Sequence, residues 1–470
     1  MSSNKLQLPL ELSLQKLYND KKDSAFSSTH QKVVDSRAEA FHYFETNGLP
    51  STKLERWRST NLKKSYLNEY QIGDKEPSFD KKINEIFNCN VHGFNTNVFA
   101  LLNGWYYCPE EEMIQTLDCG IIIGSINSAQ KKYPEIFDKY YGEILTNQDG
   151  LSAVNNAVYT DGLFIYVPDN VVSEKAVQLI KMVNRDNNFM VNTRNLIILG
   201  DNSSLSFLHC DDSINHHAGF LVTNTEIFVG KNSDLNLYKL QNLNNSTTLV
   251  NSSFIQQEAN SKTNIDVLTF NGGMIRNDFT IDLIGEGADA DISGMYLMDD
   301  NQHVDNQVKL IHSAPNCTSK ELFKGVLDDK ASGVFNGYIY VARDAQKTLA
   351  FQKNANILMT SDASIDTMPF LEIYADDVKC SHGATVGQLD DEALFYLMQR
   401  GIPESDAKLL LMYAFVTEVT NKIGIEALRT SIDDMVKKRL RGDLSICEKC
   451  VLHCSNPDIP VEFEIDMSKI

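Results

Sequence analysis

Hydrophobic and polar positions follow different periods in three parts of the chain. Up to about residue 95, apolar positions recur at helical spacing among many charges, which predicts an N-terminal helical region over residues 1–96. Over residues 97–385, short alternating runs such as LFIYVP and EIFVG are separated by Asn, Asp, Gly and Ser, a pattern typical of strands joined by turns. Helical spacing returns after this point, so residues 386–470 are expected to form a C-terminal helical region with a Cys-containing tail.

The middle part repeats a frame of strand, small residue, two polar residues, Ser or Ala, and a second strand. It occurs in NLIILGDNSSLSFL (Gly200, Ser203), EIFVGKNSDLNLY (Gly230, Ser233) and IDLIGEGADADIS (Gly285, Ala288). The first small residues lie 30 and 55 apart, and 55 is close to three repeats of about 18 or 19 residues. This period favours a β-helix in which the Ser and Ala positions occupy equivalent turns. A β-sandwich with similar turns is the alternative.

Three helices are predicted in the C-terminal region. Asp390 begins the first, Pro403 begins the second, and the third ends at Gly442. The last turn of the third helix is basic, with Lys437, Lys438, Arg439 and Arg441. Positive charge at a helix end complements the helix dipole and is usually a solvated surface, and a docking face for another protein is the sharper interpretation.

The charge of the chain excludes several classes of partner. Its 470 residues contain 43 Lys and Arg against 63 Asp and Glu, a net charge of −20, which disfavours nucleic acid and anionic membranes. No apolar run approaches the roughly 18 residues of a membrane span, and the first residues do not resemble a secretion signal. Nine cysteines are too few and too scattered for a disulfide scaffold, so we expect reduced thiols and a cytoplasmic protein.

Few residues suggest chemistry of their own. The chain has no phosphate-binding loop, no HExxH pair and no GxSxG elbow, so the sequence gives little support to a self-contained enzyme. Cys380 and His382 would face the same side of an extended segment. A thiolate and an imidazole suit iron or zinc, and they also suit a nucleophile pair. A buried thiol beside a hydrogen-bonded histidine is the structural alternative.

A second group of soft ligands lies in the tail. Cys447, Cys450, His453 and Cys454 fall within eight residues and could chelate zinc or an iron–sulfur cluster. A single CxxC pair is a weak signal, and an exposed reduced tail is the alternative. We therefore expect the three tail cysteines (Cys447, Cys450 and Cys454) to be a weak metal site at best.

Longer segments resemble a known family. The run from Phe370 to Phe415, FLEIYADDVKCSHGATVGQLDDEALFYLMQRGIPESDAKLLLMYAF, closely resembles the signature of the SufB/SufD family of iron–sulfur cluster assembly scaffolds. Lys324–Thr348 resembles the family's β-helix core, and Gly48–Leu62, GLPSTKLERWRSTNL, resembles the N-terminal motif of its SufD branch. The form CSHGAT and the absence of a cysteine at 356–360 also match that branch.

The resemblance implies a right-handed parallel β-helix between two helical regions. It also implies assembly with a SufB-type scaffold, through the end of the β-helix, and with a SufC-type ABC ATPase, through the C-terminal helices. By this resemblance His382 acts with a cysteine of the SufB-type scaffold at their interface, where we expect it to matter for iron, and Cys380 has a less certain role there. The expected ATPase contacts in the C-terminal helices are Leu409, Leu410, Phe415, Lys437 and Arg439.

Together these observations predict a non-enzymatic scaffold subunit of a SufBCD-type complex. No cofactor is expected to bind tightly to the chain alone; iron or an iron–sulfur cluster would be held transiently in the complex, and a homodimer could form in isolation. Two rival functions are a β-helix hydrolase or lyase using Cys380 and His382, and a purely structural partner of the ATPase.

Overall fold

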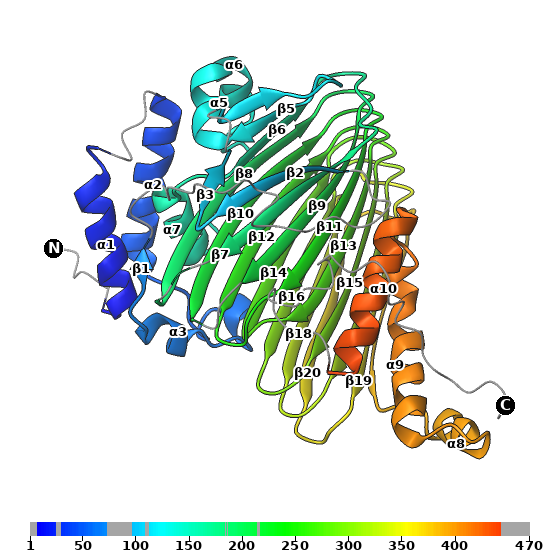
Figure 1. Ribbon diagram of the computed structural model, residues 1–470. Coiled ribbons are helices and arrows are strands. Elements are labelled where there is room, and N and C mark those ends of the chain that lie inside the picture. The colour runs from blue at the N-terminus through cyan, green and yellow to red at the C-terminus, as the bar shows by residue number, and fades with distance from the viewer. Residues whose placement is uncertain are drawn as a thin grey trace.

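The computed structural model describes residues 7–24, 30–72, 96–108, 112–183, 185, 187–213 and 217–442. A long stack of strands forms the centre of the molecule. The N-terminal and C-terminal helices lie on different sides of this stack (Figure 1). The helical regions therefore cover the strands and do not form separate layers at both ends of the stack.

Two sheets make up the stack in the described part of the chain. The first sheet has 11 strands, comprising β1 (Gln71–Ile72), β4 (Ile114–Thr116), β5 (Ile122–Ser125), β6 (Leu163–Val167), β8 (Phe189–Leu199), β10 (Gly219–Val229), β12 (Thr248–Gln257), β14 (Met274–Leu283), β16 (His303–His312), β18 (Ser332–Val341) and β20 (Ser364–Ile373). The second has 10 strands, comprising β2 (Thr96–Leu102), β3 (Trp105–Tyr107), β7 (Ala176–Val183), β9 (Ser204–Ser213), β11 (Asp234–Asn242), β13 (Lys262–Asn271), β15 (Asp289–Met298), β17 (Thr318–Leu327), β19 (Leu349–Leu358) and β21 (Lys379–Gly387).

From β6 onward, strands alternate between the two sheets along the chain, and each pairs in parallel with the next strand of its own sheet. This is a parallel β-helix, which confirms the predicted fold class. The predicted period of 18 or 19 residues is wrong, because paired residues on successive coils lie between 26 and 32 residues apart. Each coil contributes one strand of about ten residues to each sheet. The spacing of 55 between Gly230 and Gly285 is consequently two coils and not three.

The predicted equivalence of turn positions is confirmed. The carbonyls of Ser203, Ser233, Ser261 and Ala288 each accept a hydrogen bond from the first residue of a strand on the next coil. Beside them, Asn202, Asn232 and Asn260 adopt left-handed backbone conformations with φ of 54–55°. Asn tolerates this conformation. Their side-chain amides form a ladder, with bonds of 3.1 and 3.4 Å, that aligns one coil with the next.

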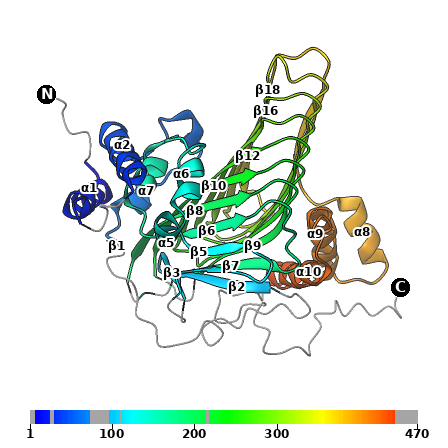
Figure 2. The same cartoon turned by 90° about the horizontal axis from the view of Figure 1, so that it is seen from above.

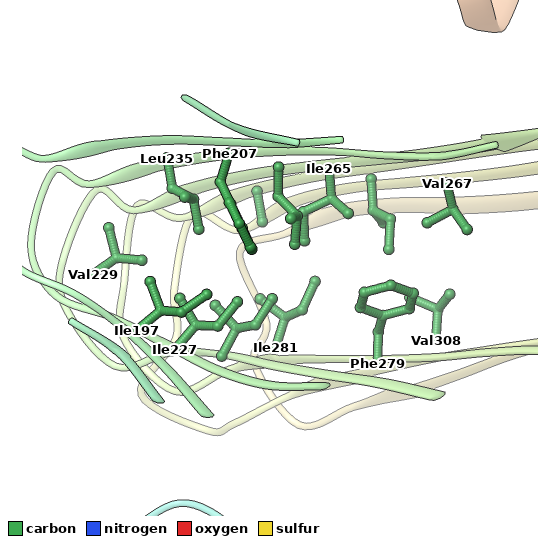
Figure 3. Close-up of a cluster of buried hydrophobic side chains, with 14 of the residues drawn as sticks. Ile197, Phe207, Ile227, Val229, Leu235, Ile265, Val267, Phe279, Ile281 and Val308 are labelled. Carbon is green, nitrogen blue, oxygen red and sulfur yellow. The ribbon is translucent and has the colours of Figure 1, made fainter. Parts of the chain in front are cut away.

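Inward-facing side chains of the two sheets form the main core. Ile197, Ile227 and Ile281 come from the first sheet, and Phe207 and Leu235 come from the second, so the two layers meet between the sheets (Figure 3). These side chains are at most 2% exposed. At about 25 cal/mol per Å² of apolar surface, such continuous burial is the main source of stability.

The N-terminal helices α1 (Pro9–Lys21), α2 (Gln31–Asn47) and α3 (Lys63–Leu67) and the short 3₁₀ helix η1 (Glu55–Trp57) share a core with the outer face of the first sheet. The part of the chain predicted as β-helix, residues 97–385, also contains three helices between β5 and β6: α5 (Ile126–Lys132), α6 (Pro134–Tyr140) and α7 (Gly150–Val158). The apolar face of α7 packs on β8 and β10 and against α2. The continuous stack of coils therefore begins near β6.

A buried ion network joins the N-terminal motif to the sheet. Arg276 of β14 pairs with Asp305 and Asp278, and its guanidinium stacks 4.1 Å from the Trp57 ring centroid. Arg56 reaches the same Asp278 carboxylate. Because each buried charge has an opposite partner, the network can be desolvated without leaving a bare ion.

The C-terminal region consists of α8 (Asp391–Gln399), α9 (Glu404–Thr420) and α10 (Glu426–Leu440). Apolar side chains of α9 and α10 pack on the outer face of the second sheet, where Leu240, Leu268 and Leu297 lie (Figure 2). Helix α8 projects beyond this packing and buries none of its side chains completely. In the described residues, no helix is long and apolar enough to cross a membrane.

Candidate functional site at the open end of the β-helix

The β-helix ends at β20 and β21, which each pair with a strand on one side only. Both strands therefore present unpaired backbone groups, and among the described residues no further coil covers the interior behind them. Large apolar side chains on and next to these strands are exposed: Phe351, Met368, Phe370, Ile373, Tyr374 and Val386. Within the described chain, this end has the features of a docking surface.

Both predicted site residues lie on β21, in positions that face the same way. Cys380 pairs with Ala350 and packs at the margin of the main core, so its side chain points inward. His382 pairs with Gln352 and is exposed because the next coil is missing. The strand thus brings the two residues to one face as predicted, although no hydrogen bond joins them in the described structure.

The surroundings of Cys380 disfavour a nucleophile. The thiol is half-buried, and this desolvation raises the pKa of Cys380 above its usual value. The thiolate is the reactive form, and a cationic neighbour normally stabilises it in catalytic sites. Cys380 is therefore better suited to pack, or to bind a soft metal that displaces its proton.

Two further polar residues lie beneath His382 and were missed in the sequence. Gln352 of β19 and Glu321 of β17 occupy the two preceding positions of the same column, and they are 4% and 2% exposed. The amide Nε2 of Gln352 donates to Oε2 of Glu321 over 2.6 Å. Burial raises the pKa of Glu321 to about 8. The sequence did contain a signal that Glu321 is buried. Side chains alternate between the two faces of the strand TSKELFKGVL, which places Glu321 on the same face as the buried Phe323.

A groove runs along the outer face of the first sheet toward the same end. Its volume is about 670 Å³, and it is lined by Arg56, Lys309, Tyr338 and Phe370 among others. The rings of Tyr338 and Phe370 stack with centroids 5.4 Å apart, and Glu372 accepts a hydrogen bond from Tyr338. Aromatic side chains thus continue the exposed apolar surface around the edge strand.

The structure places several of the expected ATPase contacts against the β-helix. Arg439 is buried and forms a bidentate pair with Asp299 at 2.6 and 2.7 Å, while its Nε donates to the Phe270 carbonyl. Leu409 and Phe415 lie partly buried beside the outer face of the second sheet. Arg439 therefore fastens α10 to the sheet, and the prediction that it contacts a partner has no support from its position.

Other C-terminal side chains are more accessible. Leu410 is half-buried, and Lys437 lies 3.5 Å from Asp434 and over the Tyr413 ring. On α8, Phe395, Tyr396 and Met398 are 40–63% exposed. These three side chains form the most exposed apolar surface of the described C-terminal helices.

The tail cysteines lie outside the described residues. In the part of the chain that the structure describes, no three His, Cys, Asp or Glu side chains are grouped as a metal site. Cys380 and His382 therefore form an incomplete donor set, which one or more ligands from elsewhere would have to complete.

The fold and the site define a parallel β-helix protein with helical flanks, one open end, and soft donor residues on its last strand. Two family descriptions match the chain: the SufBD core domain of the SUF system for FeS cluster assembly, over residues 182–415, and the SufBD N-terminal region, over residues 9–179. The chain belongs to the SufB/SufD family.

Two of the similar proteins carry the name of the SufD branch. The iron–sulfur cluster assembly protein SufD of Bacillus subtilis is 26% identical over 89% of this chain and 97% of its own length. SufD of Escherichia coli is 42% identical over 36% of this chain and 40% of its own length. A SufBD family protein of Synechocystis is 26% identical over 89% of this chain and 94% of its own length. These matches support a role in iron–sulfur cluster assembly and agree with the SufD-type motifs of the sequence.

Proposed function

We propose that the chain is a scaffold subunit of a SufBCD-type complex and that its open β-helix end forms part of a site for iron and nascent clusters. The observation that carries this proposal is His382, an exposed imidazole on an edge strand that is paired on one side only, near the inward-facing Cys380. Imidazole is a good ligand for borderline metals such as ferrous iron, and a thiolate is a good ligand for iron–sulfur clusters.

The partner at this end would be a SufB-type scaffold. The open edges of β20 and β21 and exposed side chains such as Phe370 and Tyr374 favour a partner that also ends in a sheet edge. A partner seated there would exclude water and supply the ligands that Cys380 and His382 lack. Iron or the cluster is the substrate of this site and stays bound only transiently.

The second partner would be a SufC-type ATPase at the C-terminal helices. The exposed surface of α8 supports a contact through Phe395, Tyr396 and Met398, whereas Arg439 is occupied by the β-helix. Leu410 and Lys437 remain proposed contacts at the margin of this region. The chain itself would hydrolyse nothing, and motion of the ATPase would reach the open end through α9, which packs on β15 and β17.

The test is anaerobic purification of the native chain with the proteins that accompany it, followed by counts of iron and labile sulfide. We expect His382→Ala to leave assembly and melting unchanged while iron and cluster transfer to an apo-acceptor fall at least several-fold. Lys379→Ala, on the same edge strand, is the matched control. If His382→Ala keeps wild-type iron content and cluster transfer, the iron site is refuted and only a structural role of the chain is left. Turnover of a polysaccharide by the chain alone would favour the hydrolase or lyase.

A further inference from the structure

The interior of the β-helix changes character just beneath His382. On successive coils of the second sheet, one inward-facing column contains Ile265, Ile292, Glu321, Gln352 and His382. The first four are at most 4% exposed. The column is thus apolar until two strands before the open end, where it becomes polar. Burial of polar groups costs free energy, so this change needs a physical reason.

The bonds of Gln352 give the column a direction. Its amide Nε2 donates to Glu321 Oε2 over 2.6 Å, toward the preceding strand. Its amide oxygen Oε1 is buried and accepts no hydrogen bond from any described residue. Because the nitrogen is already bonded to Glu321 of β17, the oxygen remains available to a donor from the other neighbouring strand, β21. A buried carbonyl without a donor is unfavourable, because it has lost its hydrogen bonds to water.

The opposite sheet leaves room for this pair. Gly337 of β18 faces the two side chains, and a Cβ at that position would lie 1.6 Å from Gln352 Nε2 and 2.8 Å from Glu321 Oε2. Any other residue would displace the amide. The glycine therefore preserves the space in which the amide keeps its orientation.

We propose that Gln352, held by Glu321, is a positioning residue for His382. When a partner covers the open end, one ring N–H of His382 donates a hydrogen bond to Gln352 Oε1. The two residues lie on neighbouring strands, whose backbones are about 4.8 Å apart. The other ring nitrogen then keeps its lone pair and faces the partner, ready to bind a divalent cation such as ferrous iron. A histidine that binds a metal through one ring nitrogen commonly donates a hydrogen bond from the N–H of the other. Loss of the acceptor of that bond weakens metal binding about 10–100-fold.

This inference rests on the proposed role of His382 and is tested in the same purified material. Gln352→Leu removes the acceptor at similar size, and Gln352→Glu keeps an acceptor oxygen. Gln241→Leu is the matched control, because Gln241 is also a buried inward-facing glutamine of the second sheet, bonded to Asn277 at 2.7 Å, but lies near the middle of the stack. For each variant we would measure assembly, melting temperature, bound iron, and affinity for Fe²⁺ in an anaerobic titration.

We expect Gln352→Leu to bind Fe²⁺ at least about tenfold more weakly, Gln352→Glu to recover most of that loss, and Gln241→Leu to bind as the wild type does. A loss in His382→Ala without any loss in Gln352→Leu would overturn the positioning role alone. An equal loss in Gln241→Leu would overturn it as well. If Gln352→Leu does not assemble, Gly337→Ala displaces the same amide, and unchanged Fe²⁺ affinity in that variant would refute the inference.

Discussion

Replacing Glu321 with Gln should make the stability of the protein less sensitive to pH. The Glu321 carboxyl group is 2% exposed and accepts a hydrogen bond of 2.6 Å from Gln352. Burial raises its pKa from 4.5 to about 8, because removal from water disfavours the charged carboxylate more than the bond from Gln352 stabilises it. Glutamine has nearly the same shape and cannot ionise, so the substitution isolates the effect of this one proton.

The sign and size follow from the two pKa values. Between pH 4.5 and 8 the folded protein keeps a proton on Glu321 that the unfolded chain has released. Unfolding therefore releases a proton, and the free energy of unfolding falls as the pH rises through this window. One pH unit corresponds to about 1.4 kcal/mol, so the wild type loses at most about 4 kcal/mol between pH 5 and 8 through this group.

Urea unfolding at pH 5, 6.5 and 8 would measure this difference. The advantage of Glu321→Gln over the wild type should grow with pH by up to about 4 kcal/mol. Glu426→Gln, at an exposed position of α10, is the control and should show a small, constant difference. Asp161 and Asp266, whose pKa values burial raises to about 6, are present in every variant and cancel. A constant or shrinking difference for Glu321→Gln would refute the assigned protonation state.

Three further outcomes are expected. Arg439→Met should leave the Asp299 carboxylate and two backbone carbonyls without their donor and release α10, at a cost of about 3–5 kcal/mol. Amide hydrogen exchange in α10 should become faster, whereas the control Lys438→Met should change it little. Equal exchange rates in Arg439→Met and the wild type would contradict the role of Arg439 in fastening α10. Trp57→Ala should cost about 3–5 kcal/mol of stability and expose the Arg276 network. Thermal unfolding would measure this loss, with Arg58→Ala as the control, and an unchanged melting temperature in Trp57→Ala would contradict it. Replacing the three tail cysteines with Ser should leave bound iron and cluster transfer unchanged, and lost iron in the purified protein would show that they bind metal.

Much of the architecture follows from local patterns in the sequence. The Gly–Asn–Ser turns at 200–203 and 230–233 repeat because the chain must reverse at the same place on each coil, and Asn accepts the left-handed conformation there. The number of strands per coil does not follow from these turns. Strands with polar inward residues, such as Gln241 and Asn251, look like turn segments in the sequence. The interval between Gly230 and Gly285 consequently looked like three short coils and is two long ones.

The site was only partly predictable for a related reason. Cys380 and His382 stand out because they are soft donors two residues apart. Glu321 and Gln352 have no special spacing along the chain, and they belong to the site only because the register of β17, β19 and β21 aligns residues 31 and 30 positions apart. Likewise, the basic end of α10 suggested a surface, but Arg439 reaches buried carbonyls that only the packed sheet supplies.

Under the proposed function, the location of His382 shows how a β-helix could turn a core position into a metal-binding one. Gln352 and His382 occupy equivalent inward positions on consecutive coils, yet Gln352 is 4% exposed and His382 is exposed. The difference is only that β19 is covered by another strand and β21 is not. A partner that continued the stack would bury His382 as deeply as Gln352 and would remove its water. The same contact would therefore strengthen a bond between imidazole and metal and hold the imidazole in one orientation. Under the proposed function, assembly, and not a change within the chain, is the event that activates the site.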